Sequence, residues 1–489
     1  MNTPYQSLGV RPFINCCSTR SVHGGSIMLP EVIAAMEAAA KSFVNINELM
    51  AGASVRIAEL TGAPSGIVTC GSAAAIALAT AAAIAGNDPI KMLALPFTGD
   101  MVRRVVMPKS HRFPYDQAIR MVGAEIVEVG TVAELEALDF STIAMVAMVG
   151  SKDCDASSPG LEDLVRVARP NGVPVLVDAA SEHIQRPNPW LRRGADLVVY
   201  SGGKFLRGPQ TSGLLIGRRD LVNSAWANSS PHRAFGRPMK VGKEDIIGVL
   251  TALEMWFRRD RDALHRVWQD DLETIAGHIS GIEGCSVDML PPERGDEQPQ
   301  LKLTWSRDRI AIDAMELRRQ LLDGTPRIML DDMSAGEGSV VIEPFSLQPG
   351  EAEIVGQAIA TALAGARQIT SPSSTAPCSD LSGTWTVDID LLRWPRRHTL
   401  TLRQDGNILT GTHSADDFGG DVSGTVMGDK AFFQFEGTFE AAIVTFRFSG
   451  GLAGDMLEGD VDLGSTTPAT RGVVSYTQYG QASWRAVRR

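Results

Sequence analysis

The sequence predicts an α/β protein with a mostly parallel, doubly wound sheet, followed by a smaller α+β region and a separate all-β antiparallel barrel. Between about residues 55 and 217, short β-branched runs alternate with helical stretches, which is the pattern of a doubly wound fold. These runs lack strict alternation, so the strands are expected to be buried on both faces of the sheet. After residue 380, short alternating strands are separated by Gly, Asn or Asp turns, which is typical of an antiparallel barrel or sandwich.

The elements are expected in the following order. The large sheet takes strands at 66–69, 92–95, 125–129, 143–149, 173–177 and 197–200, with helices at 73–85 and 161–169 between them. A long helical stretch over 244–279 leads to strands at 300–305 and 339–344 and to a last helix at 349–363. The barrel includes strands at 383–388, 398–402, 408–412, 431–437 and 444–450.

A chain of 489 residues is longer than one hydrophobic core usually organises. We expect a large domain over residues 1–245, with an N-terminal arm over 1–55, and a small α+β domain over residues 246–367. The Ser/Pro/Thr-rich stretch 368–380 has the composition of a linker. Residues 381–489 then form the barrel.

The bulk properties narrow the class of protein. A net charge of −11 argues against nucleic acid as the main partner. The six cysteines include no Cys-x-x-Cys pair, which favours reduced thiols over disulfides or a metal site. The N-terminus lacks the apolar core of a signal peptide, and the most apolar run, 73–85, is too short to span a membrane. We therefore expect a soluble cytoplasmic protein.

A lysine at the end of a predicted strand is the first candidate for chemistry. In ADLVVYSGGKFLRGPQTSGLLIG, residues 195–217, a strand ends near Tyr200 and a Ser-Gly-Gly-Lys turn presents Lys204. Open α/β sheets bind ligands at the carboxyl ends of their strands, and two glycines let the backbone bend there. A desolvated lysine in this place can form a Schiff base. The alternative is a surface lysine in a glycine-rich turn.

A carboxylate is expected at the same edge of the sheet. In VPVLVDAAS, residues 173–181, a hydrophobic strand ends at Asp178. A carboxylate there can hold the protonated nitrogen of a pyridine ring that withdraws electrons from a substrate carbon. An aspartate at a strand end is also a common helix N-cap, so this feature alone decides little.

A phosphate site is expected where VTCGSAAA, residues 68–75, passes from a strand into an Ala-rich helix. The turn Gly71–Ser72 leaves free N–H groups at a helix N-terminus, which is a ready site for an anion. Any one of these three features has an ordinary structural explanation. Together, a phosphate turn, then Asp178, then Lys204 match the phosphate, ring nitrogen and aldehyde of pyridoxal 5'-phosphate (PLP), which we expect as the cofactor.

Two further loops are weaker candidates. His111, in PKSHRFPYDQAIR (108–120), could stack over the cofactor ring, although a loop histidine is often only a polar surface residue. The cationic loop GRPMKVGK (236–243), with Arg237, could reach an anionic group, including one across a subunit interface, or could simply be a solvated turn.

With these segments in hand, residues 1 to about 365 resemble the selenocysteine-synthase-like branch of fold-type I PLP enzymes. Its members include L-seryl-tRNA selenium transferases and relatives similar to D-glucosaminate-6-phosphate ammonia-lyase. The resemblance rests on INCCSTRSVHGGSIMLPEV (14–32), IAELTGAPSGIVTCGSAAAIALATAA (57–82), HRFPYDQAIRMVGAEIVEVG (111–130), VLVDAASE (175–182), YSGGKFLRGPQTSGLLIGRRDL (200–221), GRPMKVGKEDI (236–246) and SLQPGEAEIV (346–355).

The resemblance implies a role for each candidate. Lys204 is the Schiff-base lysine and Asp178 the partner of the pyridinium nitrogen. It also implies a homodimer or higher homo-oligomer with the loop 236–243 at the interface. The remaining cofactor contacts that it implies are Gly71, Ser72 and Ser201 around the phosphate, and His111 near the ring.

The chain departs from the family pattern in two places. The family usually has Asn-Ala-Ala-Gly-Thr, whereas here Asn15 is followed by Cys-Cys-Ser-Thr and then Arg20. If this strand lines the substrate pocket, Arg20 could bind a carboxylate or a phosphate. The barrel is also foreign to the usual architecture. It begins with Leu-Ser-Gly-Thr-Trp and looks broadly lipocalin-like, with Trp385, Trp394, Phe432, Phe433 and Phe435 expected in its core.

The expected activity is that of a PLP-dependent lyase on an amino acid or amino-sugar acid, in which Lys204 removes the Cα proton and a β-substituent leaves. A racemase or aminotransferase shares the first deprotonation and stays open, as does a non-catalytic scaffold whose barrel binds a ligand. A small amino compound is the expected substrate. We expect no tRNA substrate, because the chain is acidic and begins directly at the catalytic domain.

Overall fold

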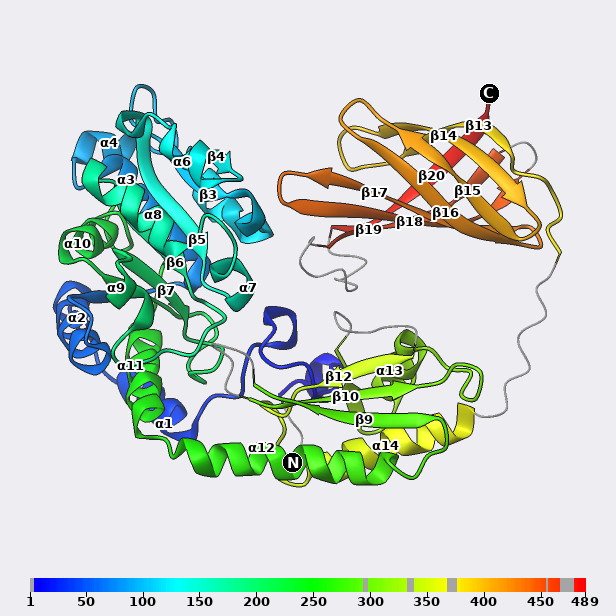
Figure 1. The fold of residues 1–489 in the computed structure, drawn as a ribbon, viewed down its shortest axis with the longest axis horizontal. Helices are drawn as coiled ribbons and strands as arrows, with labels where there is room; N and C mark the ends of the chain where they lie inside the picture. The colour runs from blue at the N-terminus through cyan, green and yellow to red at the C-terminus, as the bar shows by residue number, and fades with distance from the viewer. Residues whose placement is uncertain (1–3, 293–297, 332–337, 367–375, 454–455, 467–478) are drawn as a thin grey trace. The chain divides into compact units, whose positions relative to one another are not determined.

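In the computed structural model, a seven-stranded sheet organises the first half of the chain (Figure 1). Every neighbouring pair is parallel except the two pairs that include β8. In spatial order the strands are β2 (Gly66–Thr69), β8 (Gly213–Gly217), β7 (Leu197–Ser201), β6 (Val175–Asp178), β5 (Ile143–Val149), β3 (Arg104–Pro108) and β4 (Glu125–Val129). The structure describes residues 4–292, 298–331, 338–366, 376–453, 456–466 and 479–489.

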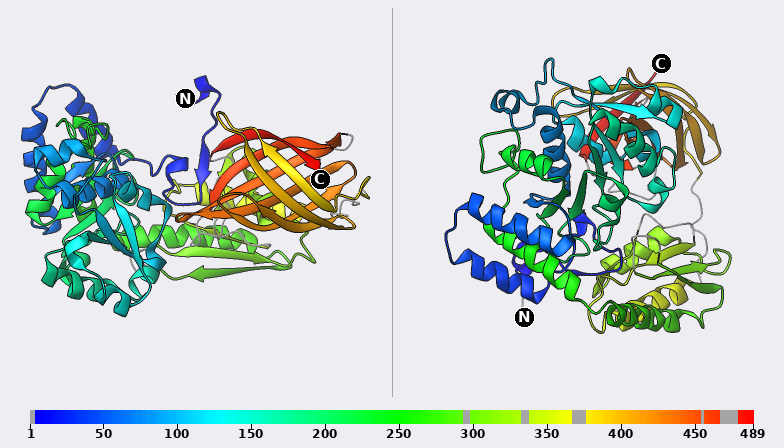
Figure 2. Two further views of the ribbon diagram at one scale, coloured as in Figure 1. Left: turned by 90° about the horizontal axis from the view of Figure 1, so that it is seen from above. Right: turned by 60° about the vertical axis from the view of Figure 1, so that its left-hand side comes forward.

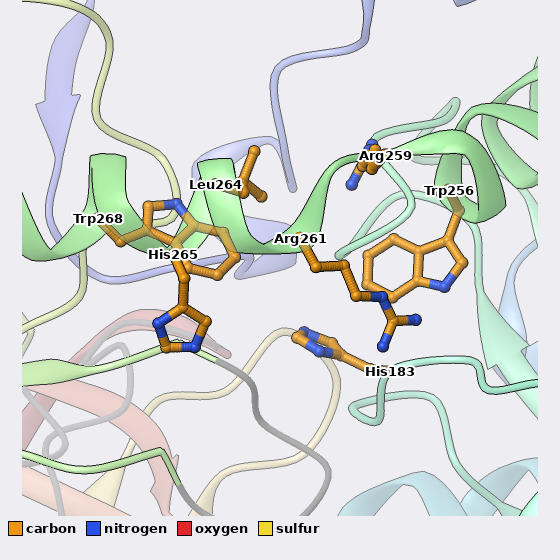
Figure 3. A pocket seen from close by; sticks show the side chains of 7 residues that line it. All are labelled: His183, Trp256, Arg259, Arg261, Leu264, His265 and Trp268. Atoms are coloured by element: carbon orange, nitrogen blue, oxygen red, sulfur yellow. The ribbon is translucent and has the colours of Figure 1, made fainter.

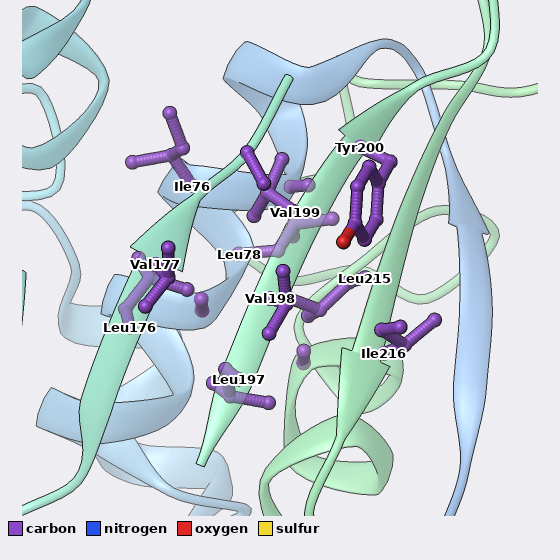
Figure 4. Close-up of a cluster of buried hydrophobic side chains, with 14 of the residues drawn as sticks. Ile76, Leu78, Leu176, Val177, Leu197, Val198, Val199, Tyr200, Leu215 and Ile216 are labelled. Carbon is purple, nitrogen blue, oxygen red and sulfur yellow. The ribbon is translucent and has the colours of Figure 1, made fainter. Parts of the chain in front are cut away.

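The central strands are buried on both faces, which explains why their sequences are hydrophobic runs without alternation. Helix α3 (Ser72–Ala85) is buried along almost its whole length. Its many alanines let it lie close to the sheet, and Figure 4 shows Ile76 and Leu78 of this helix among side chains of β6, β7 and β8. This packing fixes the position of the helix start relative to the strand ends.

The remaining helices of this region follow the alternating pattern. Helix α11 packs against α1 and α2, and α11 and α12 follow one another along the chain (Figures 1 and 2). The bounds are α1 (Pro30–Ala40), α2 (Ile46–Thr61), α4 (Pro89–Ala94), α5 (Gln117–Arg120), α6 (Val132–Glu136), α7 (Lys152–Asp155), α8 (Leu161–Ala168), α9 (Pro189–Arg193), α10 (Arg219–Ala227), α11 (Lys243–Arg258) and α12 (Arg261–Ile279).

The structure departs from the sequence expectations in three places. The strand expected at 92–95 is helix α4, because Asp88 caps the N–H groups of Ile90 and Lys91 and Pro89 occupies the first helical position. Strand β3 was missed. The long helical stretch expected over 244–279 is helical apart from one break between α11 and α12, because Arg259 is extended and the side chain of Asp260 starts a new helix at the N–H of Ala263.

A smaller mixed region follows. Its three-stranded sheet has the order β12-β10-β9, and a short parallel pair joins β1 in the N-terminal arm to β11. The bounds are β1 (Phe13–Asn15), β9 (Cys285–Leu290), β10 (Gln300–Trp305), α13 (Ala314–Asp323), β11 (Arg327–Met329), β12 (Ser339–Ile342) and α14 (Glu351–Gly365). Most of the predicted linker, 368–375, lies outside the described residues.

The chain divides into two units, one of residues 1–303, 320–330 and 341–360, the other of residues 304–319, 331–340 and 361–489. Among the described residues, no helix is both long enough and apolar enough to cross a membrane.

The C-terminal part is a closed antiparallel barrel of eight consecutive strands, in which the last strand pairs with the first (Figure 2). Closure leaves no open sheet edge. The strands are β13 (Gly383–Ile389), β14 (Arg396–Asp405), β15 (Ile408–Ser414), β16 (Gly419–Met427), β17 (Lys430–Phe439), β18 (Ala442–Ala453), β19 (Met456–Thr466) and β20 (Gly480–Arg488).

The barrel interior combines aliphatic side chains with a group of aromatic rings. Trp385, Phe433 and Phe435 are buried there, as the sequence predicted. Trp394 and Phe432 are exposed instead, because Trp394 lies between β13 and β14 and Phe432 falls on the outward side of the alternation along β17.

Two histidines are buried among these rings. His413 stacks on Phe435 with ring centroids 3.9 Å apart, and His398 lies 5.5 Å from His413. Arg396 donates through Nε to Nε2 of His398 at 3.2 Å. Burial, the Arg396 charge and His413 together lower the pKa of His398 to about 4.

The lowered pKa of His398 predicts that the barrel loses stability as the pH falls from about 6.5 towards about 4. In this range His398 is protonated in the unfolded chain but stays neutral in the folded barrel, so a fall in pH favours unfolding. From the difference between the ordinary pKa of histidine and that of folded His398, the free energy of unfolding should fall by about 3 kcal/mol. Calorimetry of the full chain at pH 7 and pH 5 should show a smaller drop in unfolding temperature for His398→Gln than for the wild type. Equal drops in the two proteins would contradict the prediction.

Candidate active site

The carboxyl ends of several strands meet at one edge of the large sheet. Thr69, the last residue of β2, pairs with Gly213 at the start of β8, and Gly213 pairs in turn with Ser201 at the end of β7. Asp178, the last residue of β6, pairs with Val199 of β7. The turn expected to bind phosphate, the expected anion and the expected lysine turn therefore leave the sheet at the same edge.

The turn that carries Lys204 has no room for larger residues before it. A Cβ atom on Gly202 would lie 2.1 Å from Oγ of Ser212, and one on Gly203 would lie 2.3 Å from Cα of Gln210. The two glycines thus allow the turn to pack directly against residues 210–212. Close packing holds the backbone of Lys204 in one place.

The amine of Lys204 lies near a hydroxyl and a carboxyl group. Nζ of Lys204 donates to Oγ of Ser181 at 2.7 Å, and Asp178 accepts at Oδ1 from the N–H of Ala180 at 3.0 Å. Burial lowers the pKa of Lys204, with the charge of Asp178 opposing the shift, and burial raises the pKa of Asp178. Both groups are shifted towards their neutral forms.

The N-terminal arm fastens the lysine turn from one side. Gly203 O accepts from the backbone N–H of Ser26 at 3.1 Å and from its hydroxyl at 3.0 Å. Arg207, in a left-handed conformation with φ +58°, donates through Nε to Ile27 O at 2.8 Å. A non-glycine residue in this conformation costs free energy and points to a constrained site.

A second arginine holds the turn from the helix side. Arg259, between α11 and α12, donates to Phe205 O and Leu206 O, both at 3.1 Å. Burial and the charge of Arg207 lower the pKa of Arg259 to about 10. Sequence reasoning missed Ser181, Arg207 and Arg259, since nothing in their local patterns shows that they contact the lysine turn.

The Gly71–Ser72 turn begins helix α3, as the sequence predicted. Gly71 has φ +85° and ψ 167°, a conformation open essentially to glycine alone. A Cβ atom on Gly71 would meet nothing within 4 Å, whereas one on Gly213 would lie 2.5 Å from the carbonyl carbon of Gly71. The turn is therefore packed tightly on its inner side and open on the other, beside the N–H groups of a helix start.

His111 lies at the same edge, directly after β3, and its side chain is buried. Nδ1 accepts from the N–H of Val149 at 3.3 Å, so the proton resides on Nε2, which donates to Cys154 O at 2.9 Å. Burial lowers the pKa of His111. The ring is fixed and neutral.

The two predicted substrate arginines differ in their surroundings. Arg20 lies in the arm, where its carbonyl accepts from Gly25 N–H at 2.9 Å; a Cβ on Gly25 would lie 2.8 Å from Gly203 O, so this segment adjoins the lysine turn. Arg237 is exposed in the loop 236–243.

Comparison with known proteins then decides the family. Residues 49–267 match the family model described as SelA, L-seryl-tRNA selenium transferase. D-glucosaminate-6-phosphate ammonia lyase of Salmonella typhimurium is 31% identical over 361 residues, covering 72% of this chain and 95% of that protein. The chain belongs to the selenocysteine-synthase-like family of PLP-dependent enzymes.

Other relatives agree with this assignment. The 5'-C-glycyluridine monooxygenase-decarboxylase of a Streptomyces species is 34% identical over 365 residues, covering 72% of this chain and 90% of the relative. A solved structure of D-glucosaminate-6-phosphate ammonia-lyase matches with a TM-score of 0.66 at 30% identity, covering 75% of this chain and 100% of that chain. The L-seryl-tRNA(Sec) selenium transferase of Rhizobium meliloti is 30% identical, but only 45% of its length is covered.

The geometry predicts an unusually reactive amine. The protein is first treated with hydroxylamine to remove any bound aldehyde, and the rate of acetylation of Lys204 is then followed by peptide mass spectrometry as a function of pH. The pH at which this rate is half-maximal should lie below the ordinary lysine pKa of about 10.4, because burial disfavours the ammonium ion. Asp178→Asn should shift this midpoint further down, since the carboxylate stabilises the ammonium form. An unchanged or higher midpoint in Asp178→Asn would contradict the interpretation.

Proposed function

We propose that this chain is a PLP-dependent lyase that removes the α-proton of an amino acid or amino-sugar acid and eliminates its β-substituent. The observation that carries the proposal is the position of half-buried Lys204, whose amine donates to Ser181 at 2.7 Å and has a lowered pKa, at the sheet edge that also holds Asp178 and the open Gly71–Ser72 turn. The relative named as an ammonia lyase, matched over 95% of its length, supports the reaction type.

The residues at this edge fit the cofactor. The open side of the Gly71–Ser72 turn offers helix N–H groups to a phosphate. Ser201 lies nearby, because it pairs with Gly213, which in turn pairs with Thr69 just before this turn. A carboxyl group whose pKa is raised by desolvation, as in Asp178, becomes an effective anion when a cationic ring nitrogen is placed beside it. Lys204 would carry the aldehyde carbon.

His111 would lie against the ring of the cofactor. Its two nitrogens are occupied by Val149 N–H and Cys154 O, so the ring is held in one orientation and in its neutral form. A neutral imidazole can stack on a protonated pyridine without charge repulsion. A cationic side chain in the same place would oppose protonation of the pyridine nitrogen.

The residues of this chain have separate roles in the proposed reaction. When bound, the cofactor supplies an electron-withdrawing ring that stabilises negative charge on the substrate Cα. Lys204 would take the Cα proton of the substrate with a neutral Nζ, for which its lowered pKa prepares it. Ser181 holds Nζ through its hydroxyl at 2.7 Å.

The proposed elimination needs no reactant besides the substrate and water. The ammonium form of Lys204 returns a proton to the leaving β-hydroxyl, which departs as water as the Cα–Cβ double bond forms. The resulting enamine takes up one water molecule and releases ammonia and a 2-keto acid. No oxidant or reductant is required.

The test is a panel of D- and L-2-amino-3-hydroxy acids, from serine to 2-aminoaldonic acids, assayed for ammonia and 2-keto acid in equal amounts. Lys204→Ala should lose at least about a thousandfold in rate, because it lacks the proton carrier, and should also lose the absorbance between about 410 and 430 nm of lysine-bound cofactor. Lys91→Ala, an exposed lysine in α4, serves as the matched control and should retain both.

Release of neither ammonia nor keto acid, with loss of optical activity instead, would replace the lyase by a racemase. Keto acid formed without free ammonia, and only when a second keto acid accepts the amino group, would replace it by an aminotransferase.

One relative supports a second candidate. The protein named as a monooxygenase-decarboxylase is 34% identical over 90% of its own length, so oxidative decarboxylation at the same Cα is the competing reaction. It consumes dioxygen and releases carbon dioxide, whereas the proposed elimination does neither. An oxygen electrode run on the same substrate panel separates the two.

We further propose that Arg20 binds an acidic group of the substrate and that the chain works as a homodimer or larger homo-oligomer with Arg237 near the interface. The large exposed side chains of Phe43 and Phe97 support a covering partner surface. Light scattering that gives the 52.4 kDa mass of one chain would contradict the oligomer.

A further inference from the structure

The barrel interior contains two histidines that have no role in the proposed reaction. His398 is the third residue of β14 and His413 the last but one of β15, so both lie at the same end of the barrel. Their exposed fractions are only 0% and 3%. Because consecutive strands of the barrel are antiparallel, the connections β13–β14, β15–β16 and β17–β18 all lie at this end.

The hydrogen bonds of the two rings determine where their protons lie. Nε2 of His398 accepts from Nε of Arg396 at 3.2 Å, because a guanidinium group can only donate. The proton of neutral His398 is therefore on Nδ1. Nε2 of His413 lies 3.3 Å from Glu436 O, which can only accept, so Nδ1 of His413 carries a lone pair instead. Burial lowers the pKa of both rings and keeps them neutral.

The two Nδ1 atoms form a complementary pair. Both are buried, and within the part of the chain that the structure describes neither has a hydrogen-bond partner. Buried polar groups in native proteins almost always have a partner, because an unsatisfied one costs free energy. The ring centroids are 5.5 Å apart, so this end of the barrel holds one donor, on His398, close to one acceptor, on His413. A metal ion does not suit the pair, since a protonated Nδ1 has no lone pair to give.

The surroundings of the two histidines are aromatic. His413 stacks on Phe435, with ring centroids 3.9 Å apart and planes 18° from parallel. The ring of His398 lies 5.7 Å from Phe418 and 5.5 Å from Phe446. Phe418 and Phe446 are themselves stacked at 5.9 Å. Planar rings are therefore the groups that pack beside this donor and acceptor.

One of these rings comes from a connection and closes the barrel end. Phe418 lies between β15 and β16, and its side chain is only partly buried. The ring lies against Gly437, where a Cβ atom would be 1.9 Å from Cδ2 of Phe418. The guanidinium carbon of Arg396 lies 4.8 Å from the centre of the same ring, and Arg396 also pairs with Asp417. The absence of a side chain at Gly437 thus makes room for one aromatic ring beside the histidines.

We propose that this end of the barrel binds a small uncharged aromatic compound with a hydroxyl group, a phenol, whose ring takes the place of the Phe418 ring. A hydroxyl group can accept from Nδ1–H of His398 and donate to Nδ1 of His413 at the same time. Neutral imidazoles favour an uncharged ligand, because a buried charge needs a partner and Arg396 already pairs with Asp417. This binding function is independent of the proposed elimination.

The first test compares phenol with toluene, which has the same ring and a methyl group in place of the hydroxyl. Calorimetric titration of the cofactor-loaded full chain should show saturable binding of phenol, at least about tenfold tighter than that of toluene, because a site that bonds a hydroxyl discriminates against an analogue without one. In histidine-labelled protein, phenol should shift the imidazole NMR signals of His398 and His413. Equal affinities, or phenol binding that leaves both signals unchanged, would overturn the proposal.

The second test uses variants of the barrel end. His398→Phe and His413→Phe each remove one hydrogen bond, so each should weaken phenol binding about fivefold or more and change toluene binding little. Phe418→Ala should strengthen the binding of both compounds, since the ring of the chain no longer competes. The matched control is His265→Phe, because His265 lies on α12, outside the barrel, where it lines a small pocket with Trp268 (Figure 3). This variant should bind phenol as the wild type does.

The competing occupant is a buried water molecule that bridges the two Nδ1 atoms. In that case phenol does not bind up to its solubility, or it binds equally well to the wild type and to His398→Phe, and either result overturns the proposal. Unfolding temperatures show which variants are folded. The comparison of phenol with toluene on the wild type needs no variant, so it decides the question even where a substitution prevents folding.

Discussion

The active edge depends on how closely the turn before Lys204 packs against its neighbours. Gly202 and Gly203 leave no space for a Cβ atom, because Ser212 and Gln210 approach to little more than 2 Å from where it would be. The arm then bonds to Gly203 O, and Arg259 bonds to the two carbonyls that follow the lysine. A flexible side chain thus starts from a backbone fixed on every side, which limits the positions its amine can reach.

The electrostatics of the edge follow from burial. The pKa of Lys204 is lowered, that of Asp178 is raised and that of His111 is lowered, each mainly by loss of water. All three groups are therefore shifted towards neutrality in the chain alone. A cofactor with an anionic phosphate and a cationic ring nitrogen would supply the charges that this arrangement lacks, and it would leave the lysine free to accept a proton.

Much of this edge could be predicted from the sequence, since strand ends, glycine turns and helix starts are local patterns. The order of Gly71, Asp178 and Lys204 along the chain was enough to place them at one edge, because parallel strands end together. Arg207 and Arg259 could not be found in this way, as their importance comes from contacts with distant backbone carbonyls. The strand expected at 92–95 was wrong for a different, local reason, because the N-cap at Asp88 outweighs a short apolar run.

The most direct measurement of the central claim is reduction of the purified full chain with borohydride, followed by peptide mapping. Borohydride fixes a lysine-bound cofactor irreversibly, so the modified residue can be read from the masses of its fragments. The account predicts one pyridoxyl-phosphate adduct per chain, on Lys204, with loss of the absorbance between about 410 and 430 nm. An adduct on another lysine, or a fully loaded protein whose Lys204 peptide stays unmodified, would contradict it.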